Sequence, residues 1–225
     1  VFAGISLGAA VYPNNGNSAD KLLKHSDLAM YSAKAKGKNT FSFFSDEMAE
    51  KLHLRFDIEQ DIRRGIKQQE FKVVYQPKYG LADDEIMGFE ALIRWHHPTK
   101  GVVHPDDFIP IAEESDLICE LGEFVLRTAC DQIIHWKQLN IQSVPISVNV
   151  SVAQLKYEAP GTNLMDILSY YDIEKDMLEL EITESMLLDD EVNAIEFLNK
   201  VRAMGVNIAL DDFGTGYSSL NYLCS

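Results

Sequence analysis

The chain has few cysteines, no excess of basic residues and no long apolar run. Cys119, Cys130 and Cys224 are widely separated and form no Cys-x-x-Cys pair, so we interpret them as buried thiols of a reducing, cytoplasmic protein. The 20 basic residues are outnumbered by 35 acidic ones, and the net charge of −15 argues against a nucleic-acid-binding surface. No stretch of about 18 apolar residues predicts a membrane segment. The first residue is not methionine, so we expect a longer parent protein.

The most informative stretch is DDFGTGYSSL, residues 211–220. It follows an apolar run, and alternation along residues 206–211 points Asp211 inward at the end of a predicted strand, with Asp212 at the start of the loop. Two adjacent carboxylates repel each other unless cations hold them, which favours a divalent metal site. A solvated Asp-Asp turn is the alternative, and this stretch alone does not separate the two.

Hydrophobic periodicity predicts an α/β protein. Before residue 71 it predicts a strand, a helix, a second strand and a charged linker helix. After residue 71, strands alternate with helices, which indicates parallel βα units. The predicted strands span residues 2–12, 40–44, 71–77, 86–95, 144–150, 178–183 and 206–210, and the predicted helices span 20–36, 45–70, 108–114, 120–139 and 190–204.

The spacing of polar residues on these strands is regular. Asn149, Glu181 and Asp211 follow one another at intervals of about thirty residues, the length of one βα unit. Residues at that period, all facing one way, converge at the carboxyl ends of the strands of a parallel barrel. With Glu90 and Asp212 they form an oxygen-only ligand set that has room for two hard cations. A glutamate inside a strand is costly to desolvate unless a metal or a basic group meets it, and a satisfied core charge is the alternative.

Five motifs occur in order from about Arg55 onward. They are EALIRW followed by HHP (90–98), FIPIAE (108–113), NVS (149–151), LEITE (180–184) and DDFGTGY (211–217). Together they resemble the EAL family of cyclic di-GMP phosphodiesterases. The resemblance implies a (β/α)8 TIM-like barrel, which this chain would contain incompletely because the family continues through three more strands. Those strands would supply a lysine, a glutamate and a glutamine of the site.

The resemblance also implies roles for individual residues. The implied reaction is hydrolysis of cyclic di-GMP to linear pGpG with two Mg²⁺ or Mn²⁺ ions, in a protein that forms a homodimer through this domain. A degenerate receptor that binds cyclic di-GMP without cleaving it is the alternative. The implied metal ligands are Glu90, Asn149, Glu181, Asp211 and Asp212, of which Glu90, Asp211 and Asp212 are also catalytic; the implied substrate contacts are Arg94, Leu92 and Gln76, and Glu184 anchors the loop 213–220.

The first part of the chain carries a second resemblance. Residues 5–13, 22–39 and 40–44, including Gly37-Lys38-Asn39, resemble the carboxyl-terminal third of a GGDEF (diguanylate cyclase) domain. The segment that would hold the GGDEF signature is absent, so no cyclase residue is assigned. We therefore expect an α+β GGDEF remnant over 1–45, a linker helix over 46–54 and the EAL domain over 55–225. We interpret the adjacent His96 and His97 as loop residues after a strand.

Overall fold

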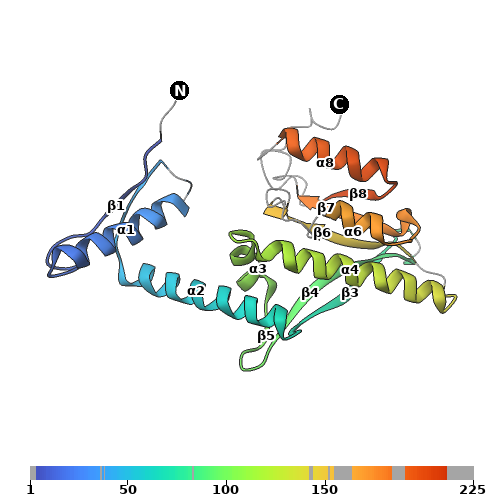
Figure 1. The fold of residues 1–225 in the computed structure, drawn as a ribbon, viewed down its shortest axis with the longest axis horizontal. Coiled ribbons are helices and arrows are strands. Elements are labelled where there is room, and N and C mark those ends of the chain that lie inside the picture. The colour runs from blue at the N-terminus through green and yellow to red at the C-terminus, as the bar shows by residue number, and fades with distance from the viewer. Residues whose placement is uncertain are drawn as a thin grey trace. The chain divides into compact units, whose positions relative to one another are not determined.

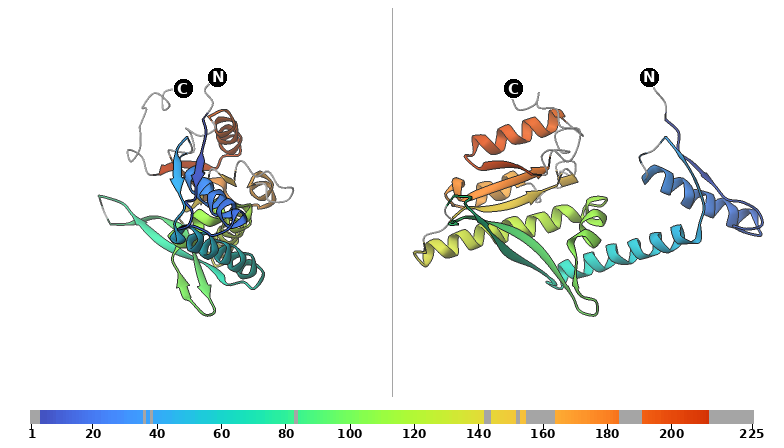
Figure 2. Two further views of the ribbon diagram at one scale, coloured as in Figure 1. Left: turned by 90° about the vertical axis from the view of Figure 1, so that its left-hand side faces the viewer. Right: turned by 180° about the vertical axis from the view of Figure 1, so that it is seen from behind.

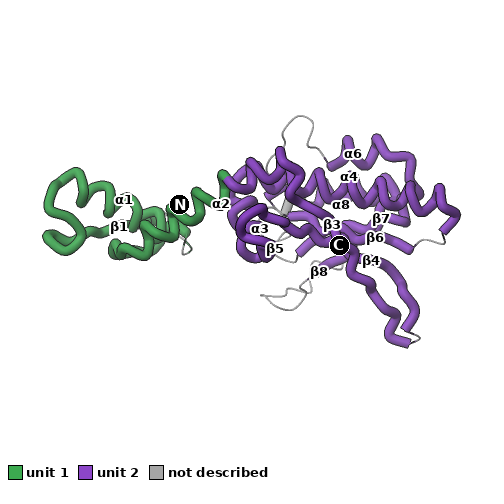
Figure 3. Tube along the Cα trace, turned by 90° about the horizontal axis from the view of Figure 1, so that it is seen from below, with its two compact units in different colours: residues 1–60 green, residues 61–225 purple. Residues whose placement is uncertain are grey.

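The chain folds into two compact units, residues 1–60 and residues 61–225 (Figure 3). A computed structural model describes residues 4–35, 37, 39–82, 84–141, 144–151, 153–154, 164–183 and 191–211. Every described residue that the sequence assigned to the site belongs to the second unit.

The first unit is a strand–helix–strand motif followed by most of a long helix. Strand β1 (Leu7–Ala9) pairs in parallel with β2 (Phe41–Phe43), and helix α1 (Ala19–Ala35) connects them. Helix α1 packs closely on β1 at Gly8, where a Cβ atom would lie only 2.0 Å from the carbonyl oxygen of Ser26. A side chain at residue 8 would therefore push the helix away from the strand.

The strand predicted over residues 2–12 is too long. Within the described residues it spans Leu7–Ala9 only. The reason is a turn: the Val11 N–H donates to Asn15 Oδ1 at 2.8 Å, and the Asn15 N–H donates to the carbonyl of Val11 at 2.7 Å. The backbone N–H and carbonyl of Val11 are thus used inside the turn and are not available for a sheet.

Helix α2 (Asp46–Lys67) begins in the first unit and ends in the second. It agrees with the helix predicted over 45–70 and includes the predicted linker, residues 46–54. The domain boundary itself stays a prediction.

The second unit contains a six-stranded sheet (Figure 1). Its order is β3-β4-β6-β7-β8, with β5 paired to β4. The pairs β4–β6, β6–β7 and β7–β8 are parallel, whereas β3 and β5 are antiparallel to β4. The strands are β3 (Phe71–Tyr79), β4 (Ile86–His97), β5 (Gly101–Val103), β6 (Ile146–Val150), β7 (Leu178–Thr183) and β8 (Asn207–Asp211).

The antiparallel pair β3–β4 corrects the expectation that parallel units begin at residue 71. Only residues 80–85 connect the two strands, and a parallel connection needs a dozen residues or more. Pro77 is compatible with this arrangement because β3 lies at the edge of the sheet, where a missing N–H leaves no central hydrogen bond unmade.

Helices cover one face of this sheet (Figures 1 and 2). Helices α4, α6 and α8 contribute to a single apolar core with alternate residues of β6 and β7, such as Val148 and Leu180. Cys130 is fully buried in this core and Cys119 is also buried, as predicted. No helix in the described part of the chain has the length and apolarity to cross a membrane. The helices are α3 (Pro105–Glu113), α4 (Leu117–Gln138), α6 (Leu164–Tyr170) and α8 (Glu191–Ala203), with a 3₁₀ helix at Lys175–Met177.

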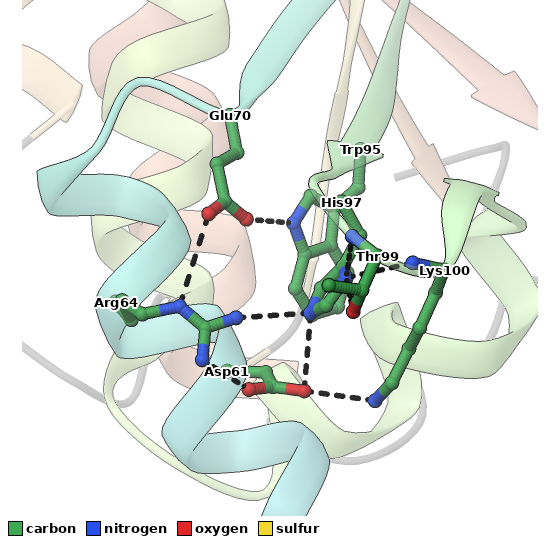
Figure 4. Close-up of polar contacts among 7 residues, drawn as sticks. All are labelled: Asp61, Arg64, Glu70, Trp95, His97, Thr99 and Lys100. Atoms are coloured by element: carbon green, nitrogen blue, oxygen red, sulfur yellow. Dashed lines mark hydrogen bonds and ion pairs between the residues drawn. The ribbon is translucent and has the colours of Figure 1, made fainter.

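The end of β4 is tied to the end of α2 by a polar cluster around Trp95 and His97 (Figure 4). The indole N–H of Trp95 donates to Glu70 Oε2 at 2.8 Å, and Arg64 lies 3.8 Å from Glu70 Oε1. Trp95 is 1% exposed and Glu70 is 9% exposed, so this is a buried carboxylate with an aromatic donor. Phe71 and Phe108 pack against the indole ring.

His97 belongs to the same cluster, which corrects its interpretation as a loop residue. Both His96 and His97 lie within β4, because pairing with β5 extends that strand, and His97 is buried. Its Nδ1 accepts the backbone N–H groups of Thr99 at 3.2 Å and Lys100 at 3.1 Å. Its Nε2 lies 2.9 Å from Arg64 Nη2 and 3.2 Å from Asp61 Oδ2, so the ring connects β4 to two residues of α2.

Candidate functional site

The site lies on the face of the sheet opposite the apolar core. Along β6 and β7, apolar core residues such as Val148 and Leu180 alternate with polar residues. The parallel register places Glu90 beside Ser147, Asn149 beside Glu181 and Thr183 beside Asp211. Because partners in register share a face, five strands contribute side chains to one polar surface, which we call the site face. It includes Gln76 and Lys78 of β3, Glu90, Leu92 and Arg94 of β4, Ser147 and Asn149 of β6, Glu179 and Glu181 of β7, and Asp211 of β8.

Glu90 and Asn149, predicted as metal ligands, are in direct contact. The Asn149 side-chain amide donates from Nδ2 to Glu90 Oε1 at 2.7 Å. Asn149 is exposed and Glu90 is half-buried. The contact joins β4 to β6 on the site face, in agreement with the sequence prediction that these residues converge.

Glu181 is the most buried carboxylate of the site face, at 7% exposure. It accepts a hydrogen bond from the Lys78 ammonium, which also donates to Ser147 Oγ at 2.6 Å and to Glu179 Oε1 at 3.3 Å. Ser147 Oγ in turn donates to Glu179 Oε1 at 2.6 Å. One lysine of β3 thus meets oxygens of β6 and β7.

Electrostatics within this group follow from burial and charge. Burial raises the pKa of Glu181, and the carboxylates of Glu90 and Asp211 add to the rise, while contact with Lys78 opposes it. Burial alone would lower the pKa of Lys78, but its contacts with Glu181 and Glu179 outweigh that effect and raise it. The lysine is therefore a stable cation, and Glu181 favours a cation beside it.

The predicted substrate contacts also lie on the site face. Arg94 and Leu92 are half-buried, and Arg94 Nη1 donates to the carbonyl of Ile93 at 2.9 Å. Gln76 is exposed and lies opposite Glu90 in the β3–β4 register. Asp211 ends β8 and is exposed. Asp212 and Glu184 lie outside the described residues.

A model of the EAL domain matches residues 59–225. The chain belongs to the EAL family. Residues 1–40, which precede the EAL match, resemble the diguanylate cyclase GGDEF domain. Both resemblances inferred from the motifs are thus confirmed.

Similar proteins come from several bacteria. Over 222 residues the chain is 44% identical to an uncharacterized signaling protein of Caulobacter vibrioides, a match that covers 99% of this chain and 27% of that protein. It is 37% identical over 218 residues to the bifunctional diguanylate cyclase/cyclic di-GMP phosphodiesterase MucR of Pseudomonas aeruginosa, covering 97% and 32% of the two. It is 34% identical over 223 residues to the cyclic di-GMP phosphodiesterase PdeR of Escherichia coli, covering 99% and 33%. The chain thus spans roughly a third or less of these curated relatives.

Solved EAL structures share this fold. A PaMucR phosphodiesterase in complex with c-di-GMP superposes with a TM-score of 0.68 at 37% identity, over 74% of this chain and 68% of that chain. The EAL enzyme Bd1971, bound to cAMP and cyclic-di-GMP, gives a TM-score of 0.67 at 29% identity, over 93% and 55%. The second unit therefore has a TIM-barrel-like EAL fold of the α/β class.

Oxygen donors on the site face suit the hard divalent cations that the EAL resemblance implies. Glu90, Asn149 and Glu181 lie on neighbouring strands, and the buried Glu181 carboxylate is already paired with a cation, the Lys78 ammonium. Within the described ranges, no three His, Cys, Asp or Glu side chains are close enough to hold a metal ion. The carboxylate and amide oxygens of Glu90, Asn149 and Glu181 nevertheless have the chemistry that a hard divalent cation prefers.

The EAL motifs assign no role to three members of the site face, Lys78, Ser147 and Glu179. Alternation was a sufficient signal for two of them, because Ser147 precedes Asn149 by two residues and Glu179 precedes Glu181 by two. Lys78 follows Gln76 by two residues in the same way, but it lies beyond Pro77, where the predicted strand ended.

Proposed function

We propose that the intact protein hydrolyses cyclic di-GMP to linear pGpG in a reaction that depends on Mg²⁺ or Mn²⁺. One observation carries the proposal: Glu90, Asn149 and Glu181 share the site face of an EAL chain whose relatives include named cyclic di-GMP phosphodiesterases. Divalent cations held by such ligands supply the activated water and the charge neutralisation that phosphodiester hydrolysis needs.

The proposed roles of the residues follow from their chemistry. Carboxylate and amide oxygens of Glu90, Asn149, Glu181, Asp211 and Asp212 would hold the cations. The Arg94 guanidinium would bind a substrate phosphate, for which its planar set of donors is suited. Leu92 and Gln76 would line the substrate pocket, and Glu184 would anchor the loop 213–220.

We propose further features that rest on the resemblance alone. Residues 1–45 would be the end of a GGDEF domain, 46–54 a linker helix and 55–225 the EAL domain, which would associate as a homodimer. We also propose a cytoplasmic location, which would suit the buried cysteines Cys119 and Cys130.

A cyclic di-GMP receptor without hydrolytic activity is the second candidate. Two contacts favour it: Glu181 is already paired with Lys78, and the Asn149 amide already donates to Glu90. In a receptor these contacts would persist, and cyclic di-GMP would bind without turnover.

One experiment separates the candidates. Purified intact protein is incubated with cyclic di-GMP and Mn²⁺, and pGpG is measured by chromatography with and without excess chelator. Turnover that disappears with chelator and returns with Mg²⁺ or Mn²⁺ supports the hydrolase. Glu181→Gln should lower turnover by several orders of magnitude, while Glu196→Gln, an exposed carboxylate of α8, should not. Tight binding of cyclic di-GMP without pGpG formation would favour the receptor, and full turnover in excess chelator would contradict a metal-dependent reaction.

A further inference from the structure

The Lys78 side chain crosses one strand to reach the site. In the β3–β4 register Lys78 lies opposite Gly88, which has no side chain on the site face. A Cβ atom at Gly88 would lie 3.1 Å from the carbonyl oxygen of Pro145, so the position is also close to the backbone before β6. Glycine at residue 88 thus leaves the path open between Lys78 and the strands β6 and β7.

The ammonium lies among three oxygens that belong to two layers of residues. Ser147 and Glu179 are partners in register, and Asn149 and Glu181 are the next partners on the site face, toward the carboxyl ends of the strands. Lys78 donates to Ser147, Glu179 and Glu181, and so it joins the two layers. The Glu181 side chain is 9% exposed and the Glu179 side chain is 29% exposed. The Lys78 ammonium therefore contacts both carboxylates on this face of β7.

The two glutamates, Glu179 and Glu181, differ in their hydrogen-bond partners. Ser147 and Lys78 both donate to Glu179 Oε1, so this oxygen is used within the lower layer. Glu181 also contacts the ammonium, but it lies beside Asn149 in the upper layer, nearer the carboxyl ends of the strands. Without the ammonium, the two carboxylates would repel each other, and a mobile divalent cation would be attracted to both.

We infer that Lys78 is a positioning residue of the metal site: its ammonium holds Glu181 as a ligand and keeps Glu179 from becoming a competing one. This inference rests on the proposed function for the identity of the reaction. It makes an unusual prediction, because loss of the lysine removes a positive charge. Divalent cations should then bind more tightly while turnover falls, since the ion is drawn toward Glu179 and away from the position that serves the substrate.

The test measures Mn²⁺ binding to the metal-free intact protein by calorimetry, without nucleotide, and then turnover of cyclic di-GMP at saturating Mn²⁺. Lys78→Met should bind Mn²⁺ about tenfold more tightly, an estimate for one charge near a partly solvated site, and kcat should fall at least about tenfold. Lys78→Arg keeps the charge and should stay near the wild-type affinity. Lys72→Met is the matched control, because Lys72 is an exposed lysine of the same strand and face; its Mn²⁺ affinity should not change.

A purely structural role for Lys78 predicts a different result. In that case Lys78→Met would bind Mn²⁺ equally or less tightly, and this outcome overturns the inference, as does an unchanged kcat. If Lys78→Met does not fold, the double variant Lys78→Met/Glu179→Gln restores the wild-type net charge. It should fold and bind Mn²⁺ close to wild type, and a failure of either also overturns the inference. Wild-type protein that binds Mn²⁺ but makes no pGpG would contradict the proposed function, while the binding comparison would still decide the role of Lys78.

Discussion

The hydrogen bond between Trp95 and Glu70 should contribute measurably to the stability of the second unit. The indole N–H donates to Glu70 Oε2 at 2.8 Å, and both side chains are buried. A hydrogen bond to a charged acceptor contributes about 1.5–3 kcal/mol, and a buried donor left without an acceptor costs about 1–3 kcal/mol. Glu70→Ala therefore loses the bond and leaves the buried indole N–H without an acceptor.

A compensating term reduces this cost. Glu70 Oε1 is buried and has no hydrogen-bond partner among the described residues, and the nearest cation is Arg64 at 3.8 Å. Removing the carboxylate relieves that desolvation, so we expect Glu70→Ala to lower the free energy of unfolding by about 2 kcal/mol. Glu70→Gln keeps an acceptor for Trp95 and should cost less than half of this.

A double-mutant cycle isolates the bond. In Trp95→Phe the donor is absent, so Glu70→Ala should be cheaper in that background by about 1.5 kcal/mol. Urea unfolding of the wild type, the two single variants and the double variant measures the coupling. Costs that add to within about 0.5 kcal/mol would refute the contribution assigned to this hydrogen bond.

Three further perturbations have expected outcomes. Gly65→Ala should destabilise the protein although alanine favours helices, because its Cβ would lie 3.0 Å from both Glu70 Oε2 and Phe71; a higher melting temperature would contradict this packing. Burial raises the pKa of Cys130 and of Tyr75 to about 12 from ordinary values of 9.0 and 10.0. Because the unfolded chain loses these protons first, the free energy of unfolding should fall as the pH rises from 9.0 to about 12, and Cys130→Ala should flatten that dependence in urea titrations. Arg94→Met should raise KM for cyclic di-GMP at least about tenfold and leave Mn²⁺ binding unchanged, and loss of Mn²⁺ binding would show that Arg94 acts on the metal site instead.

The strands that carry the site were predictable because their pattern has a short period. Strand β7 spans Leu178–Thr183, the range predicted from the sequence, since its apolar and acidic residues alternate strictly. The same alternation correctly put Glu90, Asn149 and Glu181 on one face. A period of two residues reports which face a side chain occupies, and this was enough to assemble the described part of the site.

Strand direction and pairing were less predictable. Alternation is the same in either direction, so it did not show that β3 runs antiparallel to β4. It also did not show that β5 would extend β4 through His97, because that extension depends on a partner strand. The contact of Lys78 with Glu181 joins residues more than a hundred positions apart, and no local pattern in the sequence predicts it.

The separation of core and site onto opposite faces of the same strands affects how such a protein can evolve. A substitution on the site face, at Glu181 for example, leaves its neighbours Leu180 and Ile182 in the core. A deletion of one residue within β7 would instead exchange the two faces, burying carboxylates and exposing leucines. Single substitutions are therefore a short route from hydrolase to receptor with the fold intact. We expect relatives that have lost catalysis to differ in these strands by replacements and not by gaps.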